Sequence, residues 1–222
     1  MTTPGASPEA NLITLRDPGS AAAEAYRTLR TNILFSSLDK PLHTLLVTST
    51  APDEGKSTTL ANLAVTMAQA EQRVLVVDCD LRRPSLHTLF GLPNERGLTS
   101  AILDQGEGPL PIQSTVVPGL SLLTSGPLPP RPGDLLGSRR MGQLIERLRA
   151  EADIVLFDTP PVVAVADAAA LAPRVDGVLL VLQAGMTRRD RAREARQLLE
   201  KVKANIVGVV LNGAKLERGY AY

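Results

Sequence analysis

The chain has 222 residues, of which 44% are hydrophobic and 21% charged, with a formal net charge of +1. These values predict one globular domain with a full core, exclude a disordered chain, and give no electrostatic reason to expect nucleic acid as a partner. A single cysteine excludes an internal disulfide, and no uninterrupted apolar run of about 18 residues is present. We therefore expect a cytoplasmic protein that only a partner could hold at a membrane.

Residues 1–20 contain proline and glycine without apolar periodicity and predict a flexible leader. A helix is predicted over Ala21–Leu38, because apolar side chains recur there every three or four residues. Beyond it, apolar runs alternate with helical patterns, and loops are predicted over 104–119 and 125–133. The predicted strands are 43–50, 73–78, 120–124, 153–158, 177–183 and 206–212, and the predicted helices are 55–70, 134–150, 164–172 and 187–203. Continuous hydrophobicity in the strands indicates a parallel sheet with both faces covered by helices.

A phosphate-binding loop is the most informative motif of the chain. Within residues 45–59 an apolar strand leads through a polar turn to Gly55, Lys56 and Ser57, which open a predicted helix. Unpaired amides and the helix dipole favour an anion there, the lysine can reach the β- and γ-phosphates, and the serine hydroxyl can bind Mg²⁺. The generic motif has glycine where this chain has Thr50. The predicted nucleotide-binding residues are Asp53, Glu54, Gly55, Lys56, Ser57 and Thr58.

Two further predicted strands end in carboxylates. Residues 74–77 lead to Asp78 and Asp80, which face the same side because side chains alternate along a strand, and residues 154–157 lead to Asp158. Open α/β sheets bind ligands at the carboxyl ends of their strands, and four apolar residues capped by aspartate are typical of the strand that supports Mg²⁺ in P-loop NTPases. The predicted fold is therefore α/β: a P-loop NTPase-like, predominantly parallel β-sheet with helices on both faces that binds Mg²⁺ and ATP.

These motifs resemble those of the bacterial tyrosine kinases (BY-kinases) that control capsule and exopolysaccharide assembly. The resemblance covers nearly everything after residue 24, and the Asp-x-Asp-x-Arg-Arg-Pro sequence is its most specific part. Asp53 stands where the family often has glycine, and the chain ends with two tyrosines where family members often have several. The three matching motifs are 51–58, 76–84 and 155–161.

The resemblance implies an ATP-dependent protein-tyrosine autokinase that regulates capsule or exopolysaccharide synthesis and export. We expect Lys56 to stabilise charge as the γ-phosphoryl group leaves, and Asp78 to orient or deprotonate the tyrosine hydroxyl. Ser57, Asp80 and Asp158 are expected to hold Mg²⁺ or its waters. Which of the two aspartates at 78 and 80 contacts the metal directly stays open.

The resemblance also implies that the tail tyrosines, Tyr220 and Tyr222, are phosphorylated in trans within a ring of subunits. We expect transfer in trans because the short segment after Gly219 is not expected to fold back to its own Lys56. The predicted parts are the leader 1–20, a kinase domain over 21–216 and a short tail over 217–222.

The motif Glu-x-x-Arg-x-x-Arg matches as Glu24, Arg27 and Arg30, which share one face of the first predicted helix. By resemblance this face is expected to form the subunit contact. The resemblance further implies a membrane-spanning activator, the polysaccharide co-polymerase protein, that recruits the kinase to the inner face of the plasma membrane.

Two alternatives stay open. A partition or division-site ATPase of the MinD/ParA kind shares the fold, but such ATPases carry a signature lysine where this chain has Ala51. The second alternative is a catalytically weak, nucleotide-dependent scaffold of the polysaccharide machinery. A phosphotransfer assay separates them, because labelled tyrosine indicates the kinase and free phosphate alone indicates the ATPase.

Overall fold

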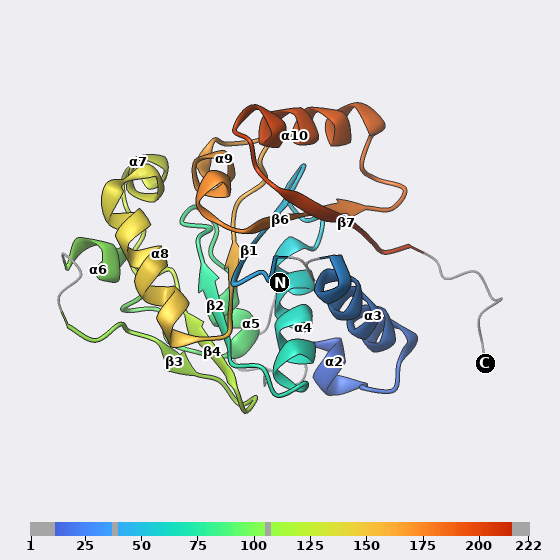
Figure 1. Cartoon of the computed structure of the whole chain (residues 1–222), viewed down its shortest axis with the longest axis horizontal. Coiled ribbons are helices and arrows are strands. Elements are labelled where there is room, and N and C mark those ends of the chain that lie inside the picture. The colour runs from blue at the N-terminus through green and yellow to red at the C-terminus, as the bar shows by residue number, and fades with distance from the viewer. Residues whose placement is uncertain (1–11, 37–39, 105–107, 215–222) are drawn as a thin grey trace.

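A computed structural model describes residues 12–36, 40–104 and 108–214 of the chain (Figure 1). Its elements are α2 (Ile13–Arg16), α3 (Ala21–Ser36), β1 (Thr44–Ser49), α4 (Lys56–Ala68), β2 (Val74–Asp78), α5 (Leu86–Phe90), α6 (Leu98–Leu103), β3 (Gln113–Ser114), β4 (Leu120–Leu123), α7 (Pro132–Gly137), α8 (Arg139–Glu151), β5 (Ile154–Asp158), α9 (Asp167–Leu171), a 3₁₀ turn (Ala172–Arg174), β6 (Gly177–Gln183), α10 (Arg189–Lys201) and β7 (Ile206–Asn212). Among these residues no helix is both long and apolar enough to cross a bilayer.

The strands form one sheet in the order β3-β4-β2-β5-β1-β6-β7. Every neighbouring pair is parallel except β3 with β4. The carboxyl ends of the parallel strands therefore lie along one edge of the sheet, with β1 between β5 and β6 near its middle. The predicted fold class and the six predicted strands are confirmed.

The two faces of the sheet bury separate apolar clusters, because successive side chains of a strand point to opposite sides. On β1, Leu45 and Val47 belong to one cluster and Leu46 to the other. Residues of α3, α4 and α5 complete the first cluster, and residues of α6 to α10 complete the second. In Figure 1, α2 and α3 lie beside α4, and α7 and α8 lie across the sheet from them.

Part of the predicted leader belongs to the folded domain. Leu12 is completely buried in the core, and the backbone amide and hydroxyl of Thr14 both donate to Asn62 Oδ1 on α4, at 3.0 and 2.9 Å. The Ser20 hydroxyl accepts from the amide of Ala23 in the first turn of α3. The prediction of a flexible leader up to residue 20 is therefore wrong for residues 12–20, because this segment carries its own apolar anchor. Residues 1–11 lie outside the described part.

Shorter elements also differ from the prediction. The helix predicted over 134–150 is two helices, since Ser138 leaves helical geometry and caps α8 by accepting from the amide of Met141 at 3.1 Å. The short elements α5, α6 and β3 lie in segments where no element was predicted. Their few residues carry too little periodicity to stand out in the sequence.

The strand β7 corrects the expectation that every strand is covered on both faces. It is the edge of the sheet, and its residues Val209 and Leu211 are each 57% exposed. A continuous apolar run therefore does not indicate burial on both faces at this edge, where one face of β7 is left uncovered.

Candidate active site

The phosphate loop and the three predicted carboxylates, Asp78, Asp80 and Asp158, meet at the carboxyl edge of the sheet. The loop follows β1, which pairs with β5, and β5 in turn pairs with β2. Register places Asp78, the last residue of β2, directly beside Asp158, the last residue of β5. The topology thus brings residues from three distant segments to the start of α4.

Two residues give the loop its left-handed backbone, Asp53 with φ 63° and Gly55 with φ 84°. Aspartate tolerates a left-handed backbone better than most residues, and glycine adopts it without steric cost. At residue 55 a side chain is also excluded for want of space. A Cβ atom at Gly55 would collide with the side-chain amide of Asn212 at the end of β7. That amide donates to the carbonyl of Glu54 at 3.1 Å and so stabilises the loop from the end of β7.

The carboxylate of Glu54 stabilises the loop through hydrogen bonds with residues of the loop itself. The side chain is 5% exposed and accepts from the amides of Thr50 and Ala51 at 2.7 and 3.0 Å and from the Thr50 hydroxyl at 2.7 Å. It also accepts from the hydroxyl of Thr187, which precedes α10. The other five predicted nucleotide-binding residues line the cleft described below, but Glu54 does not. Its carboxylate holds the loop in shape and faces away from any ligand.

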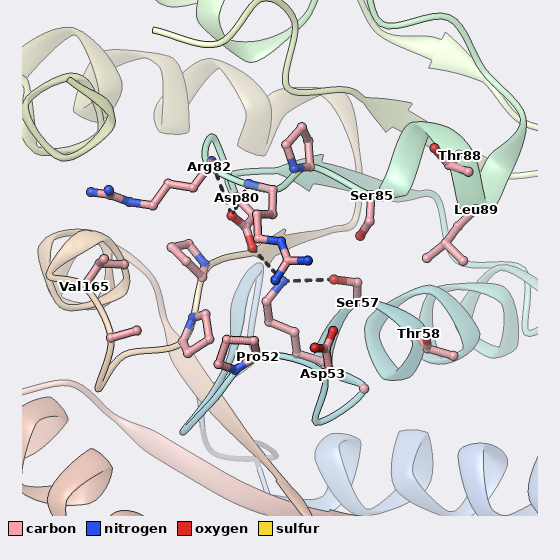
Figure 2. A pocket seen from close by; sticks show the side chains of 17 residues that line it. Pro52, Asp53, Ser57, Thr58, Asp80, Arg82, Ser85, Thr88, Leu89 and Val165 are labelled. Carbon is pink, nitrogen blue, oxygen red and sulfur yellow. Dashed lines mark hydrogen bonds and ion pairs between the residues drawn. The ribbon is translucent and has the colours of Figure 1, made fainter. Parts of the chain in front are cut away.

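The Lys56 ammonium lies where three oxygen-bearing side chains converge. Its Nζ atom is 3.0 Å from Asp80 Oδ2, 3.0 Å from Ser57 Oγ and 3.2 Å from Asp158 Oδ2. Ser57 in turn donates to Asp158 Oδ2 at 2.5 Å. Figure 2 shows Ser57 and Asp80 pointing toward each other from opposite sides of the cleft floor. The arrangement favours a cation at this point.

Burial changes the protonation of the acids. Burial, and next the charge of Asp158, raise the pKa of Asp78 to about 7. Burial also raises the pKa of Asp158, although the Lys56 ammonium opposes the shift. Burial would lower the pKa of Lys56, but the charges of Asp158 and Asp80 outweigh it, and the pKa is raised. The lysine therefore stays charged, and the acids share a site that disfavours several negative charges.

Asp78 lies beneath the cleft. It is completely buried, and its oxygens accept from the backbone amides of Asp80, Ser85 and Leu86 at 3.1 to 3.2 Å. Asp80 lines the cleft, and Asp78 does not. Asp78 is thus separated from the cleft that Asp80 lines, because the turn after β2 folds back over Asp78.

The donor set fits a magnesium ion that a nucleotide helps to hold. Mg²⁺ usually takes one or two protein carboxylates and completes its shell with water and phosphate oxygens. Ser57, Asp80 and Asp158 offer one hydroxyl and two carboxylates around the present position of the ammonium. Within the described ranges no cluster of three acids, histidines or cysteines could hold a metal without such help.

The cleft beside these residues has a volume of about 780 Å³, large enough for a nucleotide. Its further lining includes Arg82, Arg83, Pro160 and Pro161. Arg82 runs away from Ser57 toward Val165 (Figure 2) and forms a bidentate ion pair with buried Asp167, at 2.8 and 3.1 Å. Arg83 has no ion pair with any described residue. Sequence reasoning assigned neither arginine a role, although both stand in the matched motif.

Other predicted residues lie elsewhere. Glu24, Arg27 and Arg30 are on α3, away from the cleft. Arg27 pairs with Glu24 at 2.7 Å, and Arg30 donates to the carbonyl of Thr66 on α4 at 2.6 Å. The tail tyrosines, Tyr220 and Tyr222, lie outside the described residues.

Comparisons with known proteins identify the family of the chain. A family model named ParA, described as an iron-transfer P-loop NTPase of the NUBPL kind, matches residues 41–218. The chain is 43% identical over 218 residues to the tyrosine-protein kinase YwqD of Bacillus subtilis, covering 98% of this chain and 92% of that one. It is 36% identical over 205 residues to the putative tyrosine-protein kinase CapB of Staphylococcus aureus, covering 92% and 90% of the two chains.

Solved structures are similar as well. The chimerical protein CapA2B2 has 38% identity and a TM-score of 0.88, with 93% of this chain and 91% of that one covered. The septum site-determining protein MinD of Pyrococcus horikoshii, solved with Mg-ADP, has a TM-score of 0.63 at 22% identity, with 76% and 69% covered. At that identity the likeness is one of fold alone.

Proposed function

The chain belongs to the bacterial tyrosine-protein kinases, on the P-loop NTPase fold of the ParA family, and we propose that it transfers the γ-phosphoryl group of ATP to tyrosines of its own C-terminal tail. The observation that carries this proposal is the convergence of Lys56, Ser57, Asp80 and Asp158 at the start of α4. A loose phosphoryl-transfer transition state needs positioned positive charge more than covalent chemistry, and this cluster supplies it.

Lys56 and the amides of the loop would contact the β- and γ-phosphates. Ser57, Asp80 and Asp158 would hold Mg²⁺, which supplies charge neutralisation between the phosphates when it is bound. The ammonium of Lys56 now occupies the point between the two carboxylates, so it must turn toward the phosphates as a nucleotide enters. The MinD neighbour, which shares the fold, was solved with Mg-ADP, and this supports Mg²⁺ and an adenine nucleotide as the proposed ligands.

Asp78 is our candidate for the group that orients or deprotonates the acceptor tyrosine. A pKa of about 7 suits a base that works near neutral pH. Because Ser85 and Leu86 hold its carboxylate from above, the turn over 81–85 must shift before a tyrosine hydroxyl could reach it. Asp80, which already faces the cleft, would stay with the metal.

Tail phosphorylation in trans, within a ring of subunits, is part of the proposal. Asn212, near the last described residue, lies beside Gly55 of the loop, so a short tail starts close to its own active site. Ten residues follow Asn212 and could span up to about 35 Å. The support for transfer in trans therefore comes from family resemblance, and a dilution series tests it: transfer in trans slows with dilution, whereas transfer in cis does not.

We further propose that a membrane-spanning activator recruits the kinase to the inner face of the plasma membrane, in the service of capsule or exopolysaccharide synthesis. The similar CapA2B2 structure is a chimera, which supports a partner segment that docks on the kinase. The proposed parts are a leader now limited to residues 1–11, a kinase domain to residue 216 and a tail over 217–222.

The test uses purified full chain, Mg²⁺ and ATP labelled in the γ position. We expect label on tyrosine in the wild type, none in Lys56→Met, and wild-type labelling in the control Lys201→Met, whose lysine is exposed on α10. Replacing Tyr220 and Tyr222 by phenylalanine should remove nearly all label. Tyr26→Phe should not, because Tyr26 is half-buried and burial raises its pKa. Free phosphate without labelled tyrosine would favour the MinD/ParA-like ATPase, and neither product would favour the scaffold.

A further inference from the structure

A second hollow lies at the edge of the sheet opposite the phosphate loop. Its volume is about 360 Å³. Its walls come from the segments that lead into β1, β6 and β7 and from the last turn of α8, which are the amino ends of parallel strands. It is lined by Lys40, Arg149, Ala172, Pro173, Arg174, Val175, Asp176, Lys203 and Asn205. Nothing in the kinase reaction uses this hollow.

Asp176, the acid among the lining residues, is held by hydrogen bonds and an ion pair within the fold. Asp176 accepts from the amides of His43 and Thr44 at 3.0 and 2.9 Å and from the Thr44 hydroxyl at 2.8 Å. It also pairs with Arg149 at 3.0 Å, and Arg149 lies 3.7 Å from Glu146 as well. The negative charge of Asp176 is therefore compensated locally and cannot neutralise the rest of the hollow.

Three cations of the hollow, Lys40, Arg174 and Lys203, have no acidic partner among the residues that the structure describes. Arg174 donates to two neutral carbonyls, those of Ser138 and Gly137, at 2.7 and 2.6 Å. Lys40 and Lys203 are exposed and form no ion pair with any residue in the described ranges. Three positive charges thus border one small polar space, and a hollow lined by one sign of charge raises the local concentration of anions.

The backbone of Lys203 gives a second, independent indication. It has φ 57°, and it ends α10 in a Schellman motif: its amide donates to Glu200 O, and the amide of Ala204 donates to Leu199 O. Glycine is the residue this position favours, and α5 ends in the same way with Gly91 at φ 64°. A lysine at a position that favours glycine is therefore a reason to test whether its side chain has a role in this hollow.

We propose that the hollow binds a phosphomonoester, or an oxyanion of similar charge, held by Lys40, Arg174 and Lys203. Lysines act as compact point charges toward phosphate, and arginine adds planar donors. The ligand could be a soluble phosphorylated compound or the head group of an anionic lipid, which share this chemistry. Because the hollow and the phosphate loop lie at opposite ends of β1, both can be occupied at once.

The test uses the full chain saturated with Mg-ADP, so that the phosphate loop cannot take the probe. Glycerol 3-phosphate is titrated while backbone amide shifts are followed by NMR. Vesicles of phosphatidylcholine with and without phosphatidic acid are tested for co-sedimentation. The variant is Lys40→Gln/Lys203→Gly, and the matched control is Lys201→Gln, which removes an exposed lysine two residues from Lys203 but outside the hollow.

We expect the largest shifts around Lys203 and Asn205, a loss of about tenfold or more in affinity in the double variant, and wild-type affinity in the control. The variant should also melt at a higher temperature, because glycine relieves the backbone of residue 203, so weaker binding cannot be ascribed to unfolding. Binding of the soluble probe supports a phosphorylated metabolite, and binding only of phosphatidic acid vesicles supports a lipid head group. No binding of either probe, or an equal loss in Lys201→Gln, would overturn the proposal.

Discussion

Asp78 shows how one buried side chain can link stability and chemistry. Its pKa is about 7, against an ordinary value of 3.8, so the folded chain keeps a proton that the unfolded chain loses. Stability then falls as pH rises between these two values, since the unfolded state binds fewer protons. We expect the ligand-free wild type to lose thermal stability from about pH 4 to about pH 7. In Asp78→Asn, which cannot ionise, this fall should be clearly smaller in melting curves recorded across that range.

The control for this prediction is Asp153→Asn. Asp153 is exposed, and its hydrogen bonds with Arg73 lower its pKa, so its effect on stability has the opposite sign. The Asp153→Asn variant should therefore still lose thermal stability between about pH 4 and about pH 7. If Asp78→Asn and the wild type lose stability equally, the raised pKa of Asp78 is wrong.

Asp53 allows a test of charge beside the phosphates. It lines the cleft and has a left-handed backbone, with φ 63°. Asp53→Asn keeps the tolerance for this backbone and removes the charge, and we expect Mg-ATP to bind a few-fold more tightly, since two charges in water interact by about 1 kcal/mol at 4 Å. Asp53→Gly should show the same gain in calorimetry and a free energy of unfolding higher by up to ~1 kcal/mol. An unchanged affinity in both variants would show that the carboxylate faces away from the phosphates.

The phosphate loop depends on a segment far away in sequence. The Thr187 hydroxyl, just before α10, donates to Glu54 and accepts from the amide of Gln183. Thr187→Val removes both bonds at nearly constant volume and should cost about 1–3 kcal/mol of stability, because the buried carboxylate loses a donor. Mg-ADP affinity should fall by about tenfold if the loop loosens, since about 1.4 kcal/mol corresponds to that factor.

Thr187→Ser is the matched control, because it keeps the hydroxyl and loses only a methyl group. It should bind Mg-ADP as the wild type does. Thr187→Val with unchanged affinity and unchanged stability would show that the bond to Glu54 does not hold the loop.

These contacts also show what could be read from the sequence. The strands were predictable because continuous apolar runs are local signals, and Lys56 and Ser57 were placed together because they are adjacent in one motif. Thr187 and Asn212 were not predictable, since they reach the loop only through the pairing of β1, β6 and β7. The buried position of Asp78 was missed for a similar reason: it depends on how the turn after β2 folds back.

The helix α3 and the edge strand β7 leave apolar side chains exposed on the surface of the molecule. Phe35 is 67% exposed at the end of α3, and Val209 and Leu211 are each 57% exposed on β7, which α3 contacts. Exposed apolar surface on neighbouring elements is typical of interfaces. Glu24 and Arg27 lie on the same helix, with side chains 65% and 33% exposed. This surface supports the proposed subunit contact through α3.

The two arginines of the proposed subunit contact, Arg27 and Arg30, differ in how far they are bound within their own subunit. Arg30 is bonded to the carbonyl of Thr66, so its removal would disturb the packing of α3 on α4 as well as any subunit contact. Arg27 instead donates to the Glu24 carboxylate and to the carbonyl of Pro18, and both of these bonds are exposed to solvent. Glu24→Ala/Arg27→Ala is therefore the cleaner variant. An exposed pair of this kind contributes at most about 1 kcal/mol to the isolated subunit, so the fold should survive.

We expect wild-type chain to form an oligomer in size-exclusion chromatography with light scattering, and Glu24→Ala/Arg27→Ala to be monomeric. Arginine forks bind carboxylates of a neighbour in two places at once, so their loss should weaken the contact more than it weakens the fold. The variant should bind Mg-ADP normally and label its own tyrosines poorly when dilute, because a tail used in trans needs a neighbour. Arg191→Ala/Glu194→Ala, an exposed pair of the same spacing on α10, should change neither property. An unchanged oligomer in the α3 variant would place the subunit contact elsewhere on the molecule.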